Sequence, residues 1–136
     1  MFNAVDHIAI AVEDLDKAIE LYQKTLGFKV THREHIEGYD VDIATIEVGG
    51  TAIELLEGKS DRSAIRRFVQ TRGPGLHHIA FVVEDIEKSL QTLRSQGVKL
   101  IDEVARPGKE NSRVAFIHPK STQGVLYELV ELPPRG

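Results

Sequence analysis

The sequence predicts an α+β protein built from two tandem βαβββ modules. The stretch 6–14 (DHIAIAVED) recurs at 77–85 (HHIAFVVED), so that His7 matches His78 at a separation of 71 positions. Ile53-Glu54-Leu55 recurs as Tyr127-Glu128-Leu129, and both halves show the same order of alternating and helical apolar patterns. Each module is too small to bury its own sheet. We therefore expect the two to pack side by side into one curved mixed sheet with its helices outside.

The first half shows each element of this module in turn. Residues 5–12 alternate as a strand with two apolar faces, and Asp14 then caps a helix that ends at Gly27. Strands are expected near 28–33, 41–48 and 52–57, and a Gly49-Gly50 hairpin joins the last two.

A linking helix, capped by Ser60 or Asp61, precedes the second half. There we expect a strand over 76–83, a helix from Asp85 to Gly97, and strands near 98–103, 113–118 and 125–131. The resulting prediction is a single domain over 1–136, with repeat one at about 4–58, the linking helix at 60–72 and repeat two at about 75–132.

Composition excludes several classes of function. The chain of 136 residues has no cysteine, so disulfides, thiolate metal sites and cysteine nucleophiles are excluded. Its net charge of −4 gives no reason to expect nucleic acid or an acidic membrane as a partner. No apolar run approaches the roughly 18 residues of a spanning helix. Because no signal peptide is recognisable, the cytoplasm is the expected location.

Four polar residues stand out because they lie on apolar strands at matching places of the two repeats: His7, Glu54, His78 and Glu128. A single strand histidine is usually a core residue, but a carboxylate on a buried strand is costly to desolvate unless a positive charge meets it. Strand parity places small residues beside them, since His7 shares a face with Ala9 and His78 with Ala80. These four residues predict a divalent metal site beside a cavity.

Two imidazoles and two carboxylates without sulfur suit Zn²⁺, Co²⁺, Ni²⁺, Mn²⁺ or Fe²⁺. On an octahedral ion they leave two adjacent positions open, where a substrate with two neighbouring oxygens can chelate. The ion would then act as a Lewis acid on a carbonyl and stabilise an enolate.

The paired modules and this residue set resemble the vicinal oxygen chelate superfamily, which includes glyoxalase I. Within it the chain is most similar to the methylmalonyl-CoA epimerases. The stretches that carry the resemblance cover most of the chain: DHIAIAVEDLDKAIELYQKTLGF, IELLEG, RGPGLHHIAFVVEDIE and FIHPKSTQGVLYELVE. The resemblance implies a metal ion, often cobalt, a homodimer, and an acyl-CoA substrate whose (2R) and (2S) forms interconvert by movement of the C2 proton.

The resemblance also implies two proton-transfer residues, one of them a metal-bound glutamate at Glu128. The second glutamate falls on Ile43, which cannot carry a proton. Asp42 could replace it if a β-bulge turned its side chain to the other face, and a metal-activated water is the alternative. Glu47 and His118 are further candidates.

Two other functions are kept open. A glyoxalase-like lyase acting on a glutathione hemithioacetal would use the same metal ligands, and drug-sequestering binding modules share the fold but generally lack the full ligand set. His118 and Lys120 are candidate substrate-binding residues. A CoA phosphate tail would also suit a group of cations in the second half: Arg106, Lys109, Arg113 and Lys120.

Overall fold

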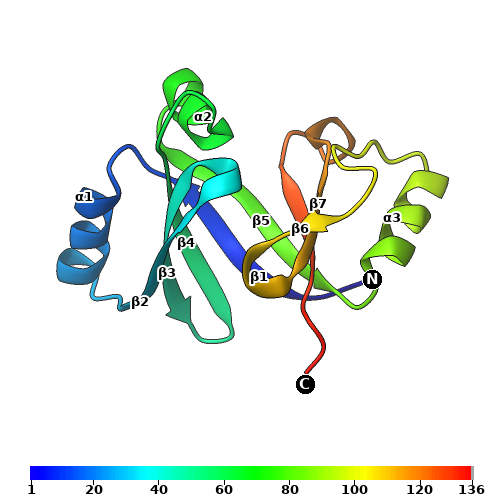
Figure 1. Cartoon of the computed structure of the whole chain (residues 1–136), viewed down its shortest axis with the longest axis horizontal. Coiled ribbons are helices and arrows are strands. Elements are labelled where there is room, and N and C mark those ends of the chain that lie inside the picture. The colour runs from blue at the N-terminus through cyan, green and yellow to red at the C-terminus, as the bar shows by residue number, and fades with distance from the viewer. Residues whose placement is uncertain (136) are drawn as a thin grey trace. The chain divides into compact units, whose positions relative to one another are not determined.

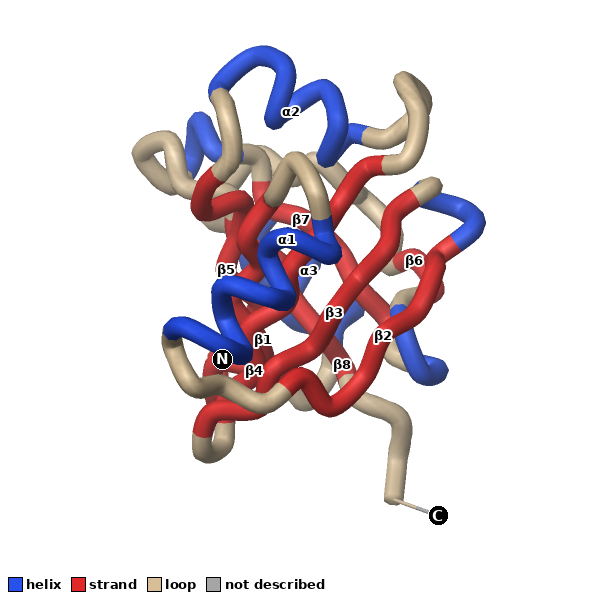
Figure 2. Tube along the Cα trace, turned by 90° about the vertical axis from the view of Figure 1, so that its left-hand side faces the viewer, coloured by secondary structure: helices blue, strands red, loops and turns tan. Residues whose placement is uncertain are grey.

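The computed structural model describes residues 1–135, which fall into two compact units. The N-terminal unit is His7–His77. The C-terminal unit combines Met1–Asp6 with the chain from His78 onward. Figure 1 labels the helices α1–α3 and the strands β1–β7, and Figure 2 also labels β8.

The N-terminal unit holds four strands in the order β2-β3-β4-β1. Strand β1 (Phe2–Ala11) runs parallel to β4 (Thr51–Gly58) from His7 onward. Strand β3 (Val41–Val48) is antiparallel to β4 and to β2 (Val30–Ile36). The β3–β4 register is unbroken from Val41 to Val48, whereas the β2–β3 register shifts between Val30 and His32.

One face of this sheet is covered by α1 (Leu15–Glu20), which continues as the π-helical segment η1 (Leu21–Thr25). The predicted cap is confirmed, because the Asp14 carboxylate accepts a hydrogen bond of 3.1 Å from the backbone N–H of Lys17. Figure 2 shows α1 lying across β1, β4 and β3. Beneath it lies an apolar cluster of buried side chains: Leu15, Ala44, Ile46 and Leu55.

The opposite face of the same sheet carries His7, and α2 (Ala64–Arg72) packs against its apolar part. Ser63 is the N-cap residue of α2, a few residues after the predicted start. The chain approaches itself closely here, since a Cβ atom added to Gly58 would lie 2.6 Å from Ser63 Oγ. The core of this face is a cluster of buried residues: Ala9, Ala11, Val41, Ile43, Leu56 and Ile65.

The C-terminal unit holds its strands in the order β5-β8-β7-β6. Strand β5 (Gly75–Val83) is parallel to β8 (Tyr127–Glu131), which is antiparallel to β7 (Arg113–Ile117). The two-residue strand β6 (Arg106–Pro107) completes the sheet at the edge of β7. Short 3-10 turns lie at Lys109–Asn111 (η3) and Pro119–Ser121 (η4).

Helix α3 (Ile86–Ser95) covers one face of this second sheet. Its predicted cap is also confirmed, since the Asp85 carboxylate accepts a 3.1 Å hydrogen bond from the Lys88 N–H. Beneath it lies a buried apolar cluster: Val83, Ile86, Leu90, Leu100, Ala115, Ile117 and Leu129.

The predicted strand near 98–103 is wrong. This segment makes only an isolated bridge between Leu100 and Ile117, although two backbone amides, those of Ile101 and Asp102, donate to Phe116 O. The Lys99 N–H donates to Ser121 Oγ at 2.8 Å, and the Asp102 carboxylate accepts from the Phe116 N–H at 2.8 Å. Side chains therefore satisfy backbone groups that a regular ladder would otherwise pair.

The predicted fold class is confirmed: the chain is α+β, with one βαβββ-type module in each half. The assignment of residues 1–136 to a single domain, with its two repeats and linking helix, stays a prediction. Among the described residues, no helix combines the length and the apolar character that crossing a membrane requires.

Candidate metal centre

In the N-terminal unit, the strand register brings His7 and Glu54 together. Ala9 of β1 lies directly opposite Glu54 of β4, so His7, two residues before Ala9, shares its face with Glu54. The His7 Nδ1 atom lies 3.7 Å from Glu54 Oε2. Both residues are almost fully buried, at 8% and 7% exposure.

The C-terminal unit repeats this arrangement with His78 and Glu128. Ala80 of β5 lies directly opposite Glu128 of β8, and His78 precedes Ala80 by two residues. The His78 Nε2 atom lies 3.2 Å from Glu128 Oε1, and both residues are buried. The His78 and Phe116 rings lie nearly perpendicular, in a T-shaped contact with a centroid distance of 5.2 Å, which restricts the orientation of the imidazole.

The predicted parity is therefore confirmed within each repeat. In both, the histidine stands two residues before an alanine, and that alanine pairs with the glutamate. The fully buried alanines, Ala9 and Ala80, put a small side chain next to the histidine and the glutamate of each pair. Each sheet thus presents one imidazole and one carboxylate from a buried position.

The two pairs fit the ligation of a divalent ion. Ligand atoms about 2.1 Å from such an ion lie roughly 3 Å apart when they occupy neighbouring positions. The separation of 3.2 Å between His78 and Glu128 is close to this value, and the separation of 3.7 Å between His7 and Glu54 is longer. Nitrogen and oxygen donors without sulfur are also the set that Zn²⁺, Co²⁺, Ni²⁺ and Mn²⁺ accept. Each pair could thus supply two ligands to such an ion.

A second pair of glutamates, which the sequence interpretation missed, fixes the strands that carry these ligands. Glu57 Oε1 accepts a 2.7 Å hydrogen bond from the Leu15 N–H, and Glu131 Oε1 accepts a 3.0 Å bond from the Ile86 N–H. Each glutamate follows its candidate ligand by three residues and joins the strand to the first turn of the unit's helix. The repeated sequence carries a signal for this contact, because Glu57 and Glu131 are equivalent in the two repeats.

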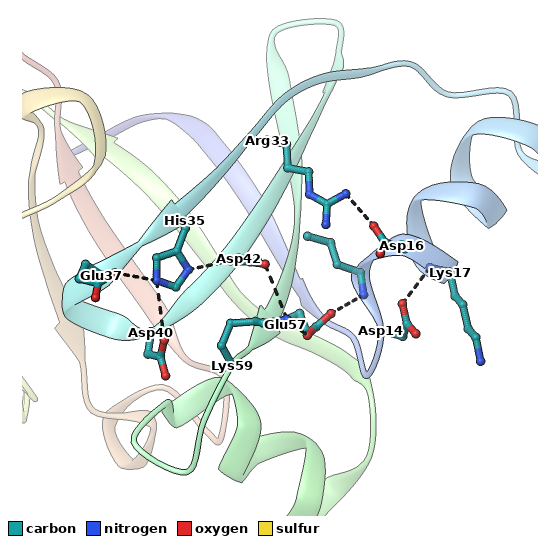
Figure 3. Close-up of polar contacts among 11 residues, drawn as sticks. Asp14, Asp16, Lys17, Arg33, His35, Glu37, Asp40, Asp42, Glu57 and Lys59 are labelled. Atoms are coloured by element: carbon teal, nitrogen blue, oxygen red, sulfur yellow. Dashed lines mark hydrogen bonds and ion pairs between the residues drawn. The ribbon is translucent and has the colours of Figure 1, made fainter.

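Asp42 lies on the other face of the N-terminal sheet. The predicted bulge in β3 is wrong, because the β3–β4 register runs unbroken through Asp42. Its Oδ1 atom lies 2.7 Å from His35 Nδ1, and its Oδ2 atom lies 3.8 Å from Lys59 Nζ. Figure 3 shows Asp42 in contact with His35. The hydrogen bond to Asp42 is the main reason why the pKa of His35 is raised. A catalytic role for Asp42 stays a prediction, one that this placement does not support.

The other predicted site residues lie in the C-terminal unit. His118 is half-buried as the N-cap residue of η4, and its Nδ1 atom accepts a 3.1 Å hydrogen bond from the Lys120 N–H. Lys120 is exposed. Two of the cations considered for a CoA tail have acidic neighbours: Arg106 pairs with Asp102, and Arg113 with Glu87 and Glu131. The substrate-binding roles stay predictions.

The sequence was compared with known protein families and with proteins of known structure. Residues 6–116 match the model of the Glyoxalase/Bleomycin resistance protein/Dioxygenase superfamily. The chain belongs to this superfamily. It is 40% identical to the uncharacterized protein YqjC of Bacillus subtilis, over 98% of this chain and 94% of that protein.

Two solved structures of methylmalonyl-CoA epimerases are also close relatives. The epimerase from Mycobacterium tuberculosis is 42% identical, with a TM-score of 0.91 over 98% of this chain and 90% of that one. A methylmalonyl-CoA epimerase in complex with methylmalonyl-CoA and NH4+ is 36% identical, with a TM-score of 0.90 over 97% and 96%. The predicted superfamily and its glyoxalase-like fold are thereby confirmed.

Proposed function

We propose that this protein is a divalent-metal-dependent epimerase that interconverts (2R)- and (2S)-methylmalonyl-CoA. The observation that carries the proposal is the repeated placement of one buried imidazole beside one buried carboxylate in each unit. The identity of 36–42% to epimerases over nearly the whole chain supports the choice of substrate.

In this proposal His7, Glu54, His78 and Glu128 together hold one ion. When bound, the ion withdraws electron density from the two oxygens of the substrate, the thioester carbonyl and the free carboxylate, and so acidifies C2 between them. Burial of the four side chains favours this role, since charged groups removed from water need a partner of opposite charge.

Glu128 is the residue of this set that moves a proton. A carboxylate has two oxygens, so one can serve as a ligand while the other takes the proton from C2. The C–H electron pair passes into the planar enolate, and a proton delivered to the opposite face gives the other epimer. Epimerisation therefore requires a second group that exchanges a proton on that face.

The test is deuterium exchange at C2. Metal-loaded protein in D₂O should incorporate deuterium into methylmalonyl-CoA, and EDTA should stop the incorporation until divalent ion is restored. Turnover of the methylglyoxal–glutathione hemithioacetal without exchange into the CoA ester would instead favour the glyoxalase-like function. Cobalt as the bound ion, a homodimer and a cytoplasmic location stay predictions beside this proposal.

A further inference from the structure

The face of the N-terminal sheet that carries His7 and Glu54 presents few other titratable side chains. Strand parity and register place on this face the strand residues His32, Glu34 and Glu47 in addition to the two candidate ligands. Glu47 is exposed, near the end of β3. The His32 side chain is half exposed, at 50%, whereas the Glu34 side chain is only 24% exposed and its Oε1 atom is buried.

Glu34 owes its orientation to an irregularity in β2. Val30 pairs with Ile46, but His32 pairs with Thr45, so β2 carries one extra residue at Thr31. The Thr31 hydroxyl donates a 3.2 Å hydrogen bond to Thr45 O. A register shift of one residue decides which side chains face which side of a sheet. Beyond this shift, Glu34 lies directly opposite Ile43 on the face of Glu54.

Ile43 is the position at which the family resemblance implies a second proton-transfer glutamate. Residues directly opposite each other in an antiparallel pair have Cβ atoms about 4.5–5.5 Å apart. A glutamate at position 34 can therefore bring its carboxylate to much of the space that a glutamate at position 43 would reach. Ile43 itself is 8% exposed and packs with Leu56 in the apolar cluster beneath α2.

We propose that Glu34 is the second proton-transfer residue, an inference that rests on the proposed epimerase function. Its carboxylate exchanges the C2 proton on one face of the enolate while Glu128 exchanges it on the other. In one direction Glu34 takes the proton, the C–H pair enters the enolate, and protonated Glu128 returns a proton to the far face. The protonation states of the two carboxyl groups are then reversed, ready for the opposite direction.

His32 gives Glu34 a route to solvent. Its Nε2 atom lies 3.5 Å from Glu34 Oε1, and its half-exposed ring is in contact with water, so the imidazole can relay a proton between the carboxylate and the solvent. A proton held by Glu34 can therefore wash out between turnovers. This arrangement explains how a carboxylate with a buried oxygen could remain in exchange with the medium.

The experiment compares deuterium incorporation from each epimer separately, in the metal-loaded wild type and in Glu34→Gln. The variant should lose about 10²–10⁴-fold in epimerisation, while one epimer still exchanges its own C2 proton through Glu128. Metal content and the circular dichroism spectrum should be unchanged. Glu13→Gln is the control, since it removes an exposed carboxylate to which no role in the site is assigned and should behave as wild type.

Ile43→Glu introduced into Glu34→Gln is the decisive second variant. It returns a carboxylate from the facing strand and should restore epimerisation at least in part. Wild-type rates in Glu34→Gln would overturn the inference, as would equal loss of exchange from both epimers without rescue by Ile43→Glu. Absence of C2 exchange in the metal-loaded wild type would instead refute the proposed function itself.

Discussion

Glu57 accepts a 2.7 Å hydrogen bond from the backbone N–H of Leu15, 42 residues earlier in the chain. The bond ties the end of β4 to the first turn of α1, where unpaired N–H groups and the helix dipole favour a negative charge. Glu131 makes the equivalent bond to Ile86 in the other repeat. The two helices are thus fixed to the strands that carry Glu54 and Glu128.

Glu57→Ala should lower the free energy of unfolding by about 1–3 kcal/mol, because it removes a charged acceptor from a half-buried amide. Urea unfolding monitored by circular dichroism measures the change. Glu57→Gln keeps an acceptor oxygen and should cost less. Equal losses in the alanine and glutamine variants would contradict the importance of this hydrogen bond.

Gly58 leaves no room for a side chain. A Cβ atom there would lie 2.6 Å from Ser63 Oγ and 2.7 Å from Arg66 Cβ, so Gly58→Ala must displace the start of α2. We expect destabilisation by about 1–3 kcal/mol in the same assay. Gly50→Ala is the control, since a Cβ atom added at that position would have nothing within 4 Å. A neutral Gly58→Ala variant would show that α2 can move away from β4 without cost.

His35 should make the stability of the β2–β3 hairpin depend on pH. Its Nδ1 atom lies 2.7 Å from Asp42 and its Nε2 atom 3.0 Å from Glu37, and these contacts raise the folded-state pKa above the ordinary value of 6.5. The stabilisation is therefore fully present below pH 6.5 and is lost as the pH rises through the raised pKa.

Unfolding of the wild type and of His35→Gln should accordingly differ most at acidic pH and least at alkaline pH. An NMR titration of the His35 ring reports the folded pKa directly, and Asp42→Asn should lower that pKa. A difference in stability that grows with increasing pH would contradict the assignment.

Much of each His–Glu pair could be predicted from the sequence, because strand periodicity alone fixes which side chains of a strand share a face. The alternation around His7, Ala9 and Glu54 was sufficient, and the same pattern recurs around His78. The caps Asp14 and Asp85 were equally accessible, since each depends on residues only three positions away.

Features that depend on the pairing register between strands could not be predicted from the local sequence pattern. The extra residue at Thr31 orients Glu34, but nothing in the local pattern reveals it. The sequence pattern instead suggested a bulge in β3 at Asp42, a residue held on the other face by His35. The segment 98–103 has the composition of a strand, yet Ser121 and Asp102 bond to the backbone groups that a ladder would use.

The central claim is that the His–Glu pairs of the two repeats together hold one ion, and metal stoichiometry tests it most directly. Purified protein titrated with Co²⁺ or Zn²⁺ should bind one ion per chain, and His7→Ala and His78→Ala should each abolish stoichiometric binding while remaining folded. Two ions per chain would contradict the claim by showing that each pair binds its own ion. One ion retained after loss of either histidine would contradict it by showing that this histidine is not a required ligand.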